Sequence, residues 1–209
     1  MKIVVKDWVS LSKYRKFVDD FEKNLYLKYF PNENEREPFN LILERIWNDE
    51  WPTTKMVLHV EDDKVIAGCI SDYYTECKTI EPIYLVVDEE HRNKGIAKEM
   101  LEDVFRGNDI VDMYVEVDNP ERVEGTDSAI DPKTRIEIYR KLGFELLDLD
   151  YVQPPLDKGM DYERNLLLMY RTKKPPLKRE RLVKFITSFY KGLNSLGTSE
   201  YFKLIDSIK

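Results

Sequence analysis

The chain of 209 residues is poor in the side chains that bind metals or form disulfides. It has two cysteines, Cys69 and Cys77, and only two histidines. Two cysteines cannot build a framework of several disulfides, and so few sulfur and imidazole ligands argue against a zinc site. We therefore expect no bound metal ion and a reduced, cytoplasmic protein.

Long apolar runs and an excess of positive charge are lacking as well. No segment approaches the roughly 18 apolar residues of a membrane-spanning helix, and residues 1–20 contain no apolar core of a signal peptide. The formal net charge is −7, which disfavours nucleic-acid binding through phosphate neutralisation. We expect neither a membrane nor a nucleic acid as a partner.

Glycine-rich phosphate loops are also absent, since neither GxxxxGK[ST] nor GxGxxG occurs. What is present is an ordinary globular composition, 42% apolar and 35% charged. Runs rich in β-branched and aromatic residues predict strands at 2–8, 56–61, 65–74, 79–87, 113–117, 144–149 and 166–170. Apolar residues three and four apart predict helices at 11–29, 38–49, 95–105, 133–142, 182–193 and 201–208.

Residues that typically cap helices or form turns support these boundaries. Ser10 is expected to cap the first helix, and Gly143 is suited to the left-handed residue that ends the helix 133–142. The turn 62–64 predicts a hairpin, and residues 119–132 form a loop rich in turn residues. The element order predicts a mixed α/β protein, a sheet covered by helices, followed by a helical tail after residue 175.

The segment RNKGIA, Arg92 to Ala97, lies between a predicted strand and a predicted helix. Gly95 lets a ligand approach the backbone, and free N–H groups with the helix dipole favour an anion. Arg92 and Lys94 add positive charge beside them. These features predict a diphosphate site; the alternative is a strand-to-helix turn with solvated charges.

The stretch VVDEEHRNKGIAKEML resembles the coenzyme A pyrophosphate motif of the GNAT acyltransferase superfamily, [RQ]-x-x-G-x-[GA] after an apolar strand. Arg92, Gly95 and Ala97 fill its three defined positions. The later stretch IEIYRKLGFELL is similar to the family's late helix and following strand, in which a tyrosine, here Tyr139, precedes Gly-Phe. The resemblance covers about residues 1–172. It implies an acetyl-CoA-dependent N-acetyltransferase.

The resemblance also implies a fold. The sheet would have six to seven strands, mostly antiparallel, splayed between the fourth and fifth. Residues 1–174 would form the GNAT acetyltransferase domain. Residues 175–209 would be a C-terminal helical extension, packed on that domain or at a homodimer contact.

The coenzyme would lie along the fourth strand and the following turn. A backbone N–H near Val86 would polarise the thioester carbonyl as negative charge develops on its oxygen. The resemblance implies that the cofactor-binding residues are Leu85, Val86, Val87, Arg92, Asn93, Lys94, Gly95, Ile96 and Ala97, with Asn119 as a further candidate.

Acyl transfer to an amine needs a base, because a primary amine is mostly protonated at neutral pH. We favour Glu116, which alternates along MYVEV and shares a sheet face with Tyr114. It could instead be a solvated charge or a carboxylate that binds substrate. Glu81 and Asp72, on neighbouring strands, are alternative bases.

The leaving thiolate needs a proton. Tyr139 matches the position of the family's usual proton donor, although a tyrosine on a helix face can simply be part of the core. The sequence departs from the family between Asn119 and Tyr139, which are twenty residues apart here and often about seven apart in the family. The insertion, residues 119–135, is expected at the acceptor mouth, beside the coenzyme, or as a surface loop. Arg135 could pair with an acceptor carboxylate or with Glu116.

The segment YVQPPL, residues 151–156, resembles a bacterial GNAT branch with Tyr-x-Gln-Pro-x-Leu after the sixth strand. Tyr151 and Gln153 are expected to line the acceptor pocket with Glu81 and Arg135; the alternative is a linker stiffened by proline. The acidic composition and aromatic residues expected near the acceptor favour a cationic small-molecule amine. These aromatic residues are Tyr26, Tyr29, Phe30 and Tyr73.

Two other functions stay open from the sequence. The chain could acetylate an amine of a protein or peptide, which would need an open groove. It could also be a sensor that binds acyl-CoA and transfers nothing.

Overall fold

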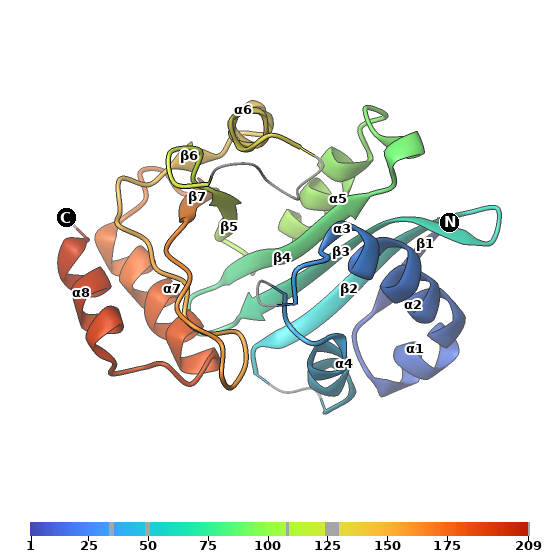
Figure 1. Ribbon diagram of the computed structural model, residues 1–209, viewed down its shortest axis with the longest axis horizontal. Coiled ribbons are helices and arrows are strands. Elements are labelled where there is room, and N and C mark those ends of the chain that lie inside the picture. The colour runs from blue at the N-terminus through green and yellow to red at the C-terminus, as the bar shows by residue number, and fades with distance from the viewer. Residues whose placement is uncertain (34–35, 49–50, 108, 124–129, 209) are drawn as a thin grey trace. The chain divides into compact units, whose positions relative to one another are not determined.

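The computed structural model describes residues 1–33, 36–48, 51–107, 109–123 and 130–208. The chain forms two compact units. Figure 1 draws its helices and strands. Unit 1 comprises Met1–Tyr73 and Ile80–Asn108, and unit 2 comprises Tyr74–Thr79 and Asp109–Lys209. Each unit is described by itself.

The sheet of unit 1 has the strand order β1 (Lys2–Val5), β2 (Thr53–Glu61), β3 (Lys64–Tyr74) and β4 (Thr79–Val87). β2 pairs antiparallel with both β1 and β3. Asp62 and Asp63 connect β2 to β3 with φ of 46° and 63°. Two consecutive positive φ values are typical of the tight turn that matches strand twist, so the predicted hairpin is confirmed.

The first helical region of unit 1 is broken into shorter pieces instead of the single helix expected at 11–29. The pieces are α1 (Trp8–Lys13), α2 (Arg15–Phe21), the π-helical η1 (Glu22–Tyr26) and α3 (Leu27–Tyr29). The expected cap was wrong. Asp7 is the N-cap and its Oδ1 accepts from the Ser10 N–H at 2.8 Å, while Ser10 Oγ accepts from the Asp7 N–H at 3.1 Å. This reciprocal capping box starts the helix three residues earlier than Leu11.

The other helices of unit 1 follow the prediction closely. α4 (Phe39–Asn48) buries Phe39, Ile42 and Ile46 in the main core. A short 3-10 helix, η2 (Glu89–His91), leads into α5 (Ile96–Phe105), for which Gly95 is the N-cap.

Unit 2 contains β5 (Asp112–Asp118), β7 (Leu166–Thr172) and β6 (Glu145–Leu146), in that order and antiparallel. α6 (Pro132–Lys141) begins after Asp131, whose side chain accepts from the Thr134 N–H at 3.0 Å. As predicted, Gly143 takes a left-handed φ of 85° after the end of α6. β6 is shorter than the expected 144–149.

The C-terminal helices belong to unit 2. α7 (Arg179–Gly192) packs on β5, where the ring of Phe185 stacks on Tyr114 with centroids 4.1 Å apart. α8 (Ser199–Ser207) lies against α7, as Figure 1 shows, and Tyr201 Oη is 3.0 Å from Thr187 Oγ1. A domain boundary at residue 174 stays a prediction.

The fold class is confirmed: the chain is mixed α/β, and its described residues form seven strands with flanking helices. The expected splay is between β4, which is described with unit 1, and β5, which belongs to unit 2. It therefore stays a prediction. None of the described helices combines the length and hydrophobicity that a membrane crossing requires.

Candidate functional site

The turn between β4 and α5 is the predicted anion cradle. Asn93 and Gly95 both have left-handed backbones, with φ of 62° and 80°. Such turns direct successive N–H groups into a concave surface that suits anions. A Cβ placed on Gly95 would meet no described atom within 4 Å, and no described side chain caps the start of α5. The backbone N–H groups at the N-terminus of α5, its positive end, therefore have no described side-chain partner. This is the arrangement that binding of a diphosphate requires.

Tyr29 holds this turn from the side of α3. The Arg92 guanidinium lies 5.0 Å from the centre of the Tyr29 ring, and Arg92 Nε donates to the Val87 carbonyl at 3.1 Å. Tyr29 Oη accepts from the Glu89 N–H at 3.1 Å. The described contacts of Tyr29 are thus with the cradle, and its placement near the acceptor stays a prediction. The same expectation for Tyr26, at 0% exposure, is corrected, because a fully buried ring cannot line an open pocket.

The three β4 residues expected along the coenzyme arm alternate along the strand. Leu85 and Val87 are partly buried and pack against the cluster of Ala67, Cys69 and Met100. Val86 points into the main core, with 6% exposure. The side chain of Val86 is therefore not available to a ligand, and the use of its backbone N–H stays a prediction.

Glu116, Tyr151 and Gln153 form one hydrogen-bonded cluster in unit 2. The Tyr151 hydroxyl donates to Glu116 Oε1 at 2.5 Å, and Gln153 Nε2 donates to Oε2 at 2.6 Å. The structure thus brings together three residues that the sequence analysis selected for separate reasons. It replaces the expected pocket-lining role of Tyr151, which is only 1% exposed, by a contact with the carboxylate.

Burial raises the pKa of Glu116 from its ordinary value of 4.5 to about 7. The hydrogen bonds from Tyr151 and Gln153 act in the opposite direction, and the negative charge of Glu163 adds to the rise. Within the described part of the chain, no lysine or arginine pairs with Glu116. A carboxylate with this pKa is divided between its charged and neutral forms near neutrality, which suits proton transfer.

The remaining candidates of unit 2 have other partners. Arg135 Nη1 donates to Oδ2 of Asp118, the last residue of β5, at 3.1 Å, and not to Glu116, which was one of its two expected partners. Pairing of Arg135 with an acceptor carboxylate stays a prediction. Tyr139, on α6, is partly buried and places its ring edge-on to Phe144, with centroids 5.2 Å apart.

Asn119 is largely committed to the turn that follows β5. Its Oδ1 accepts from the Glu121 N–H at 2.9 Å, and its backbone N–H donates to the Asn165 carbonyl at 2.7 Å. A contact with coenzyme stays a prediction. In the expected insertion, residues 124–129 lie outside the described part of the chain.

The two alternative bases are both in unit 1. Asp72 accepts from Thr54 Oγ1 at 2.6 Å and lies 3.6 Å from Arg45 Nη2, while Arg45 also pairs with Glu37. Burial raises the pKa of Asp72, and the charge of Arg45 opposes that rise. Asp72 thus has a cationic partner in Arg45, which Glu116 lacks within the described part of the chain. Glu81 is 1% exposed on β4.

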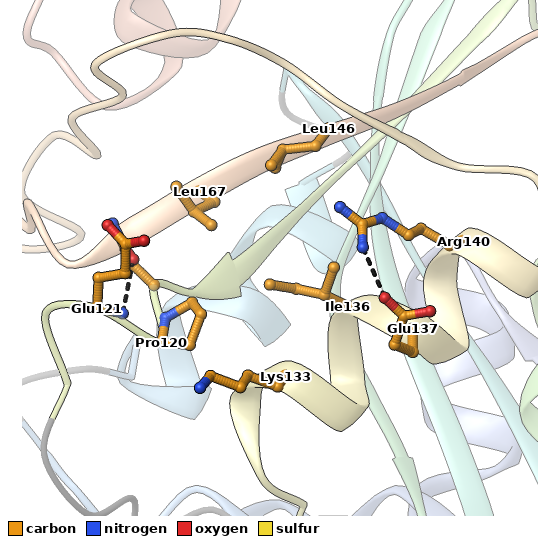
Figure 2. Close-up of a pocket in the computed structure, with 9 residues that line it drawn as sticks. Pro120, Glu121, Lys133, Ile136, Glu137, Arg140, Leu146 and Leu167 are labelled. Carbon is orange, nitrogen blue, oxygen red and sulfur yellow. Dashed lines mark hydrogen bonds and ion pairs between the residues drawn. The ribbon is translucent and has the colours of Figure 1, made fainter.

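A pocket of about 460 Å³ was not foreseen from the sequence. Figure 2 shows it where the turn after β5, α6 and the β6–β7 pair meet, with Lys133 and Arg140 on α6 and Leu146 and Leu167 on the strands. Arg140 Nη1 donates to Glu137 Oε1 at 2.6 Å across its α6 wall. Asn119 contributes to its lining.

Comparisons with known proteins bear on the family and the fold. Residues 53–146 match the family model of the acetyltransferase (GNAT) domain. A GNAT-family protein from Bacteroides thetaiotaomicron is similar in structure, with a TM-score of 0.59 and 20% identity over 85% of this chain and 89% of that chain. A search of curated proteins finds no match.

Two further structures share the fold with lower identity. Aminoglycoside 6'-acetyltransferase type Ii has a TM-score of 0.54 and 16% identity, over 84% of this chain and 99% of that one. Tetrahymena GCN5 has a TM-score of 0.51 and 13% identity, over 85% and 98%. At these identities the structures show the fold alone, and the activity rests on the family match. The family match therefore identifies a GNAT acetyltransferase domain in residues 53–146 of the chain.

Proposed function

We propose that this acetyltransferase moves an acetyl group from acetyl-CoA to the amine of a small molecule, with Glu116 as the base. The observation that carries the proposal is the Glu116 carboxylate itself. It is held by two uncharged donors, is not neutralised by a described cation, and burial raises its pKa to about 7. An isolated carboxylate of this kind is rarely retained for stability alone.

The coenzyme would be held by unit 1. The start of α5 offers open N–H groups, Gly95 leaves space for a phosphate, and Lys94 is exposed beside it. When bound, acetyl-CoA supplies the acetyl group as a thioester. Arg92, fixed by Val87 and Tyr29, would add positive charge near the phosphates.

The chemistry of unit 2 is a proton transfer at each end of the reaction. Glu116 accepts a proton from the ammonium form of the acceptor, which frees the nitrogen lone pair. The nitrogen then forms a bond with the acetyl carbon, and the carbon–sulfur bond breaks. The nitrogen releases its second proton to solvent as the amide forms. Tyr139 donates the proton that the leaving sulfur requires and regains one from solvent.

The acceptor is proposed to be a small cation. An acidic chain, net charge −7, attracts cations at long range, and Glu116 offers a local negative charge. The shared fold does not identify the acceptor, because differently named acetyltransferase structures share it. One neighbour is an aminoglycoside 6'-acetyltransferase and another is GCN5.

The test measures free thiol released from acetyl-CoA with a panel of amines, across pH 5 to 9. Glu116→Gln is expected to lower kcat/KM at neutral pH by about 100- to 10,000-fold, the usual contribution of a general base. It is also expected to abolish the acidic limb near pH 7. Glu145→Gln, which alters an exposed carboxylate of unit 2, is the matched control and should retain activity.

Three results would overturn the proposal. Coenzyme binding by calorimetry without thiol release from any amine would indicate an acyl-CoA-binding sensor. Release with peptide amines alone would indicate a protein acetyltransferase. An unchanged pH profile in Glu116→Gln would remove Glu116 from the reaction.

A further inference from the structure

We infer that Tyr151 and Gln153 are positioning residues, which hold the Glu116 carboxylate through both of its oxygens and so determine its orientation and basicity. This inference rests on the proposed function of Glu116. It assigns to the Tyr-x-Gln segment a role in the reaction that differs from lining a pocket or stiffening a linker.

The two donors engage different oxygens. Tyr151 Oη donates to Oε1 at 2.5 Å and Gln153 Nε2 to Oε2 at 2.6 Å, so the carboxylate cannot rotate without losing both hydrogen bonds. A carboxylate has about four acceptor sites, and two remain after these bonds. Glu116 therefore keeps lone pairs in a fixed direction for an ammonium proton.

The spacing of the two residues follows from an extended backbone. Side chains two residues apart in an extended segment lie on the same side, so Tyr151 and Gln153 both reach Glu116. Val152 between them points the other way and is 7% exposed. Its carbonyl accepts from Tyr190 Oη of α7 at 2.6 Å, which attaches the segment to α7.

A second attachment fixes Gln153. Its N–H donates to the Glu163 carbonyl at 2.9 Å, and the Glu163 N–H donates back to the Gln153 carbonyl at 3.0 Å. This bridge closes the loop between the two residues, so the Gln153 side chain starts from a fixed backbone. Glu163 Oε1 in turn accepts from the Asn165 N–H at 2.5 Å, just before β7.

Three side chains act on Glu116. Tyr151 and Gln153 belong to the extended segment, and Glu163 is the bridge partner of Gln153. The charge of Glu116 acts in turn on Tyr190 of α7. The residue opposite Glu116 on β7 is Leu168, which is apolar. Burial and Glu163 favour the protonated carboxyl, and only the two neutral donors favour the charged form. Removing one donor should therefore raise the pKa of Glu116 further.

The experiment compares the pH profiles of kcat/KM for Tyr151→Phe and Gln153→Met, each of which removes a donor and keeps the size of the side chain. The acidic limb is expected to move upward by about one to two pH units, since a hydrogen bond to a charged group contributes about 1.5–3 kcal/mol. Activity near pH 6 should fall roughly tenfold or more, and recover at pH 9. A purely structural role would lower activity at every pH.

The matched control is Tyr170→Phe, which removes a hydroxyl that donates to Glu145 Oε2 at 2.8 Å in the same unit. In this variant, the acidic limb of the pH profile should lie at the same pH as in the wild type. Carbon-13 NMR titration of the Glu116 carboxyl, assigned with Glu116→Gln, measures the same shift without turnover.

The outcomes separate this inference from the proposed function. If Glu116→Gln is inactive while folded Tyr151→Phe and Gln153→Met keep the wild-type limb and NMR pKa, the inference is wrong and the base assignment stands. If Glu116→Gln is fully active, the proposed function is wrong, and the NMR titration alone decides whether the two donors hold the carboxylate. Should Tyr151→Phe fail to fold, Gln153→Met still decides.

Discussion

The start of α5 depends on one residue, Gly95, whose φ of 80° is a left-handed value that residues with a Cβ adopt at a cost of about 1–2 kcal/mol. A methyl group at this position would also project into the space where a phosphate is expected. A replacement there therefore combines a backbone effect with a ligand effect, and the two must be separated.

Gly95→Ala is predicted to weaken binding of CoA by tenfold or more, measured by titration calorimetry, while it lowers stability only by the backbone cost of about 1–2 kcal/mol. Gly197 supplies the control, because its φ is 81° and a Cβ there also meets no described atom within 4 Å. Gly197→Ala should lose similar stability and keep its affinity for CoA. Equal affinities of the two variants would show that the cradle does not hold the coenzyme.

At the scale of elements, Arg181 ties α7 to β5. Its Nη1 donates to Asp112 Oδ1 at 2.6 Å and to Thr172 Oγ1 at 3.0 Å. Its Nη2 donates to the carbonyls of Lys174 and Pro176 at 2.6 and 2.8 Å. Asp112 has 0% exposure, so its charge depends on this single described arginine.

Arg181→Met is predicted to lower the free energy of unfolding by about 3–5 kcal/mol, because it leaves the Asp112 charge buried without its partner. The double variant Arg181→Met/Asp112→Asn should be more stable than Arg181→Met alone, since it removes that charge. Chemical denaturation followed by circular dichroism measures both. A double variant less stable than the single one would contradict this account of the pair.

At the scale of the whole molecule, Glu116 makes the stability of the protein depend on pH. Burial raises the pKa of its carboxyl from 4.5 to about 7, so between these pH values the folded protein binds a proton that the unfolded chain does not. The contribution of this group to the free energy of unfolding therefore falls as pH rises from about 4.5 to 7.

Glu116→Gln should lack this dependence. Thermal unfolding is expected to show that the variant gains stability relative to the wild type as pH rises through that range, while it loses acetyltransferase activity. Glu145→Gln, at an exposed carboxylate, should show no such gain. A constant difference between Glu116→Gln and the wild type from pH 4 to pH 8 would mean that the carboxyl does not titrate as its burial requires.

Local sequence was sufficient for most elements and for the backbone of the turn before α5. The hairpin at Asp62–Asp63, the end of α6 at Gly143 and the start of α5 at Gly95 depend on backbone preferences of a few adjacent residues. The first helical region was predicted less well. Its apolar periodicity continues from Leu11 to Tyr29, but the helix type changes at η1, and such a change leaves little trace in periodicity.

The sequence by itself determined which residues have the right chemistry: a glycine turn before a helix, a glutamate among apolar neighbours, and a tyrosine and a glutamine two residues apart. Only the tertiary structure decided that Tyr151 and Gln153 donate to Glu116, that Arg135 pairs with Asp118, and that Tyr29 lies against Arg92. The physical reason is distance along the chain. Backbone preferences act over a few residues, whereas these contacts join segments 17 to 63 residues apart, whose meeting depends on how the core packs.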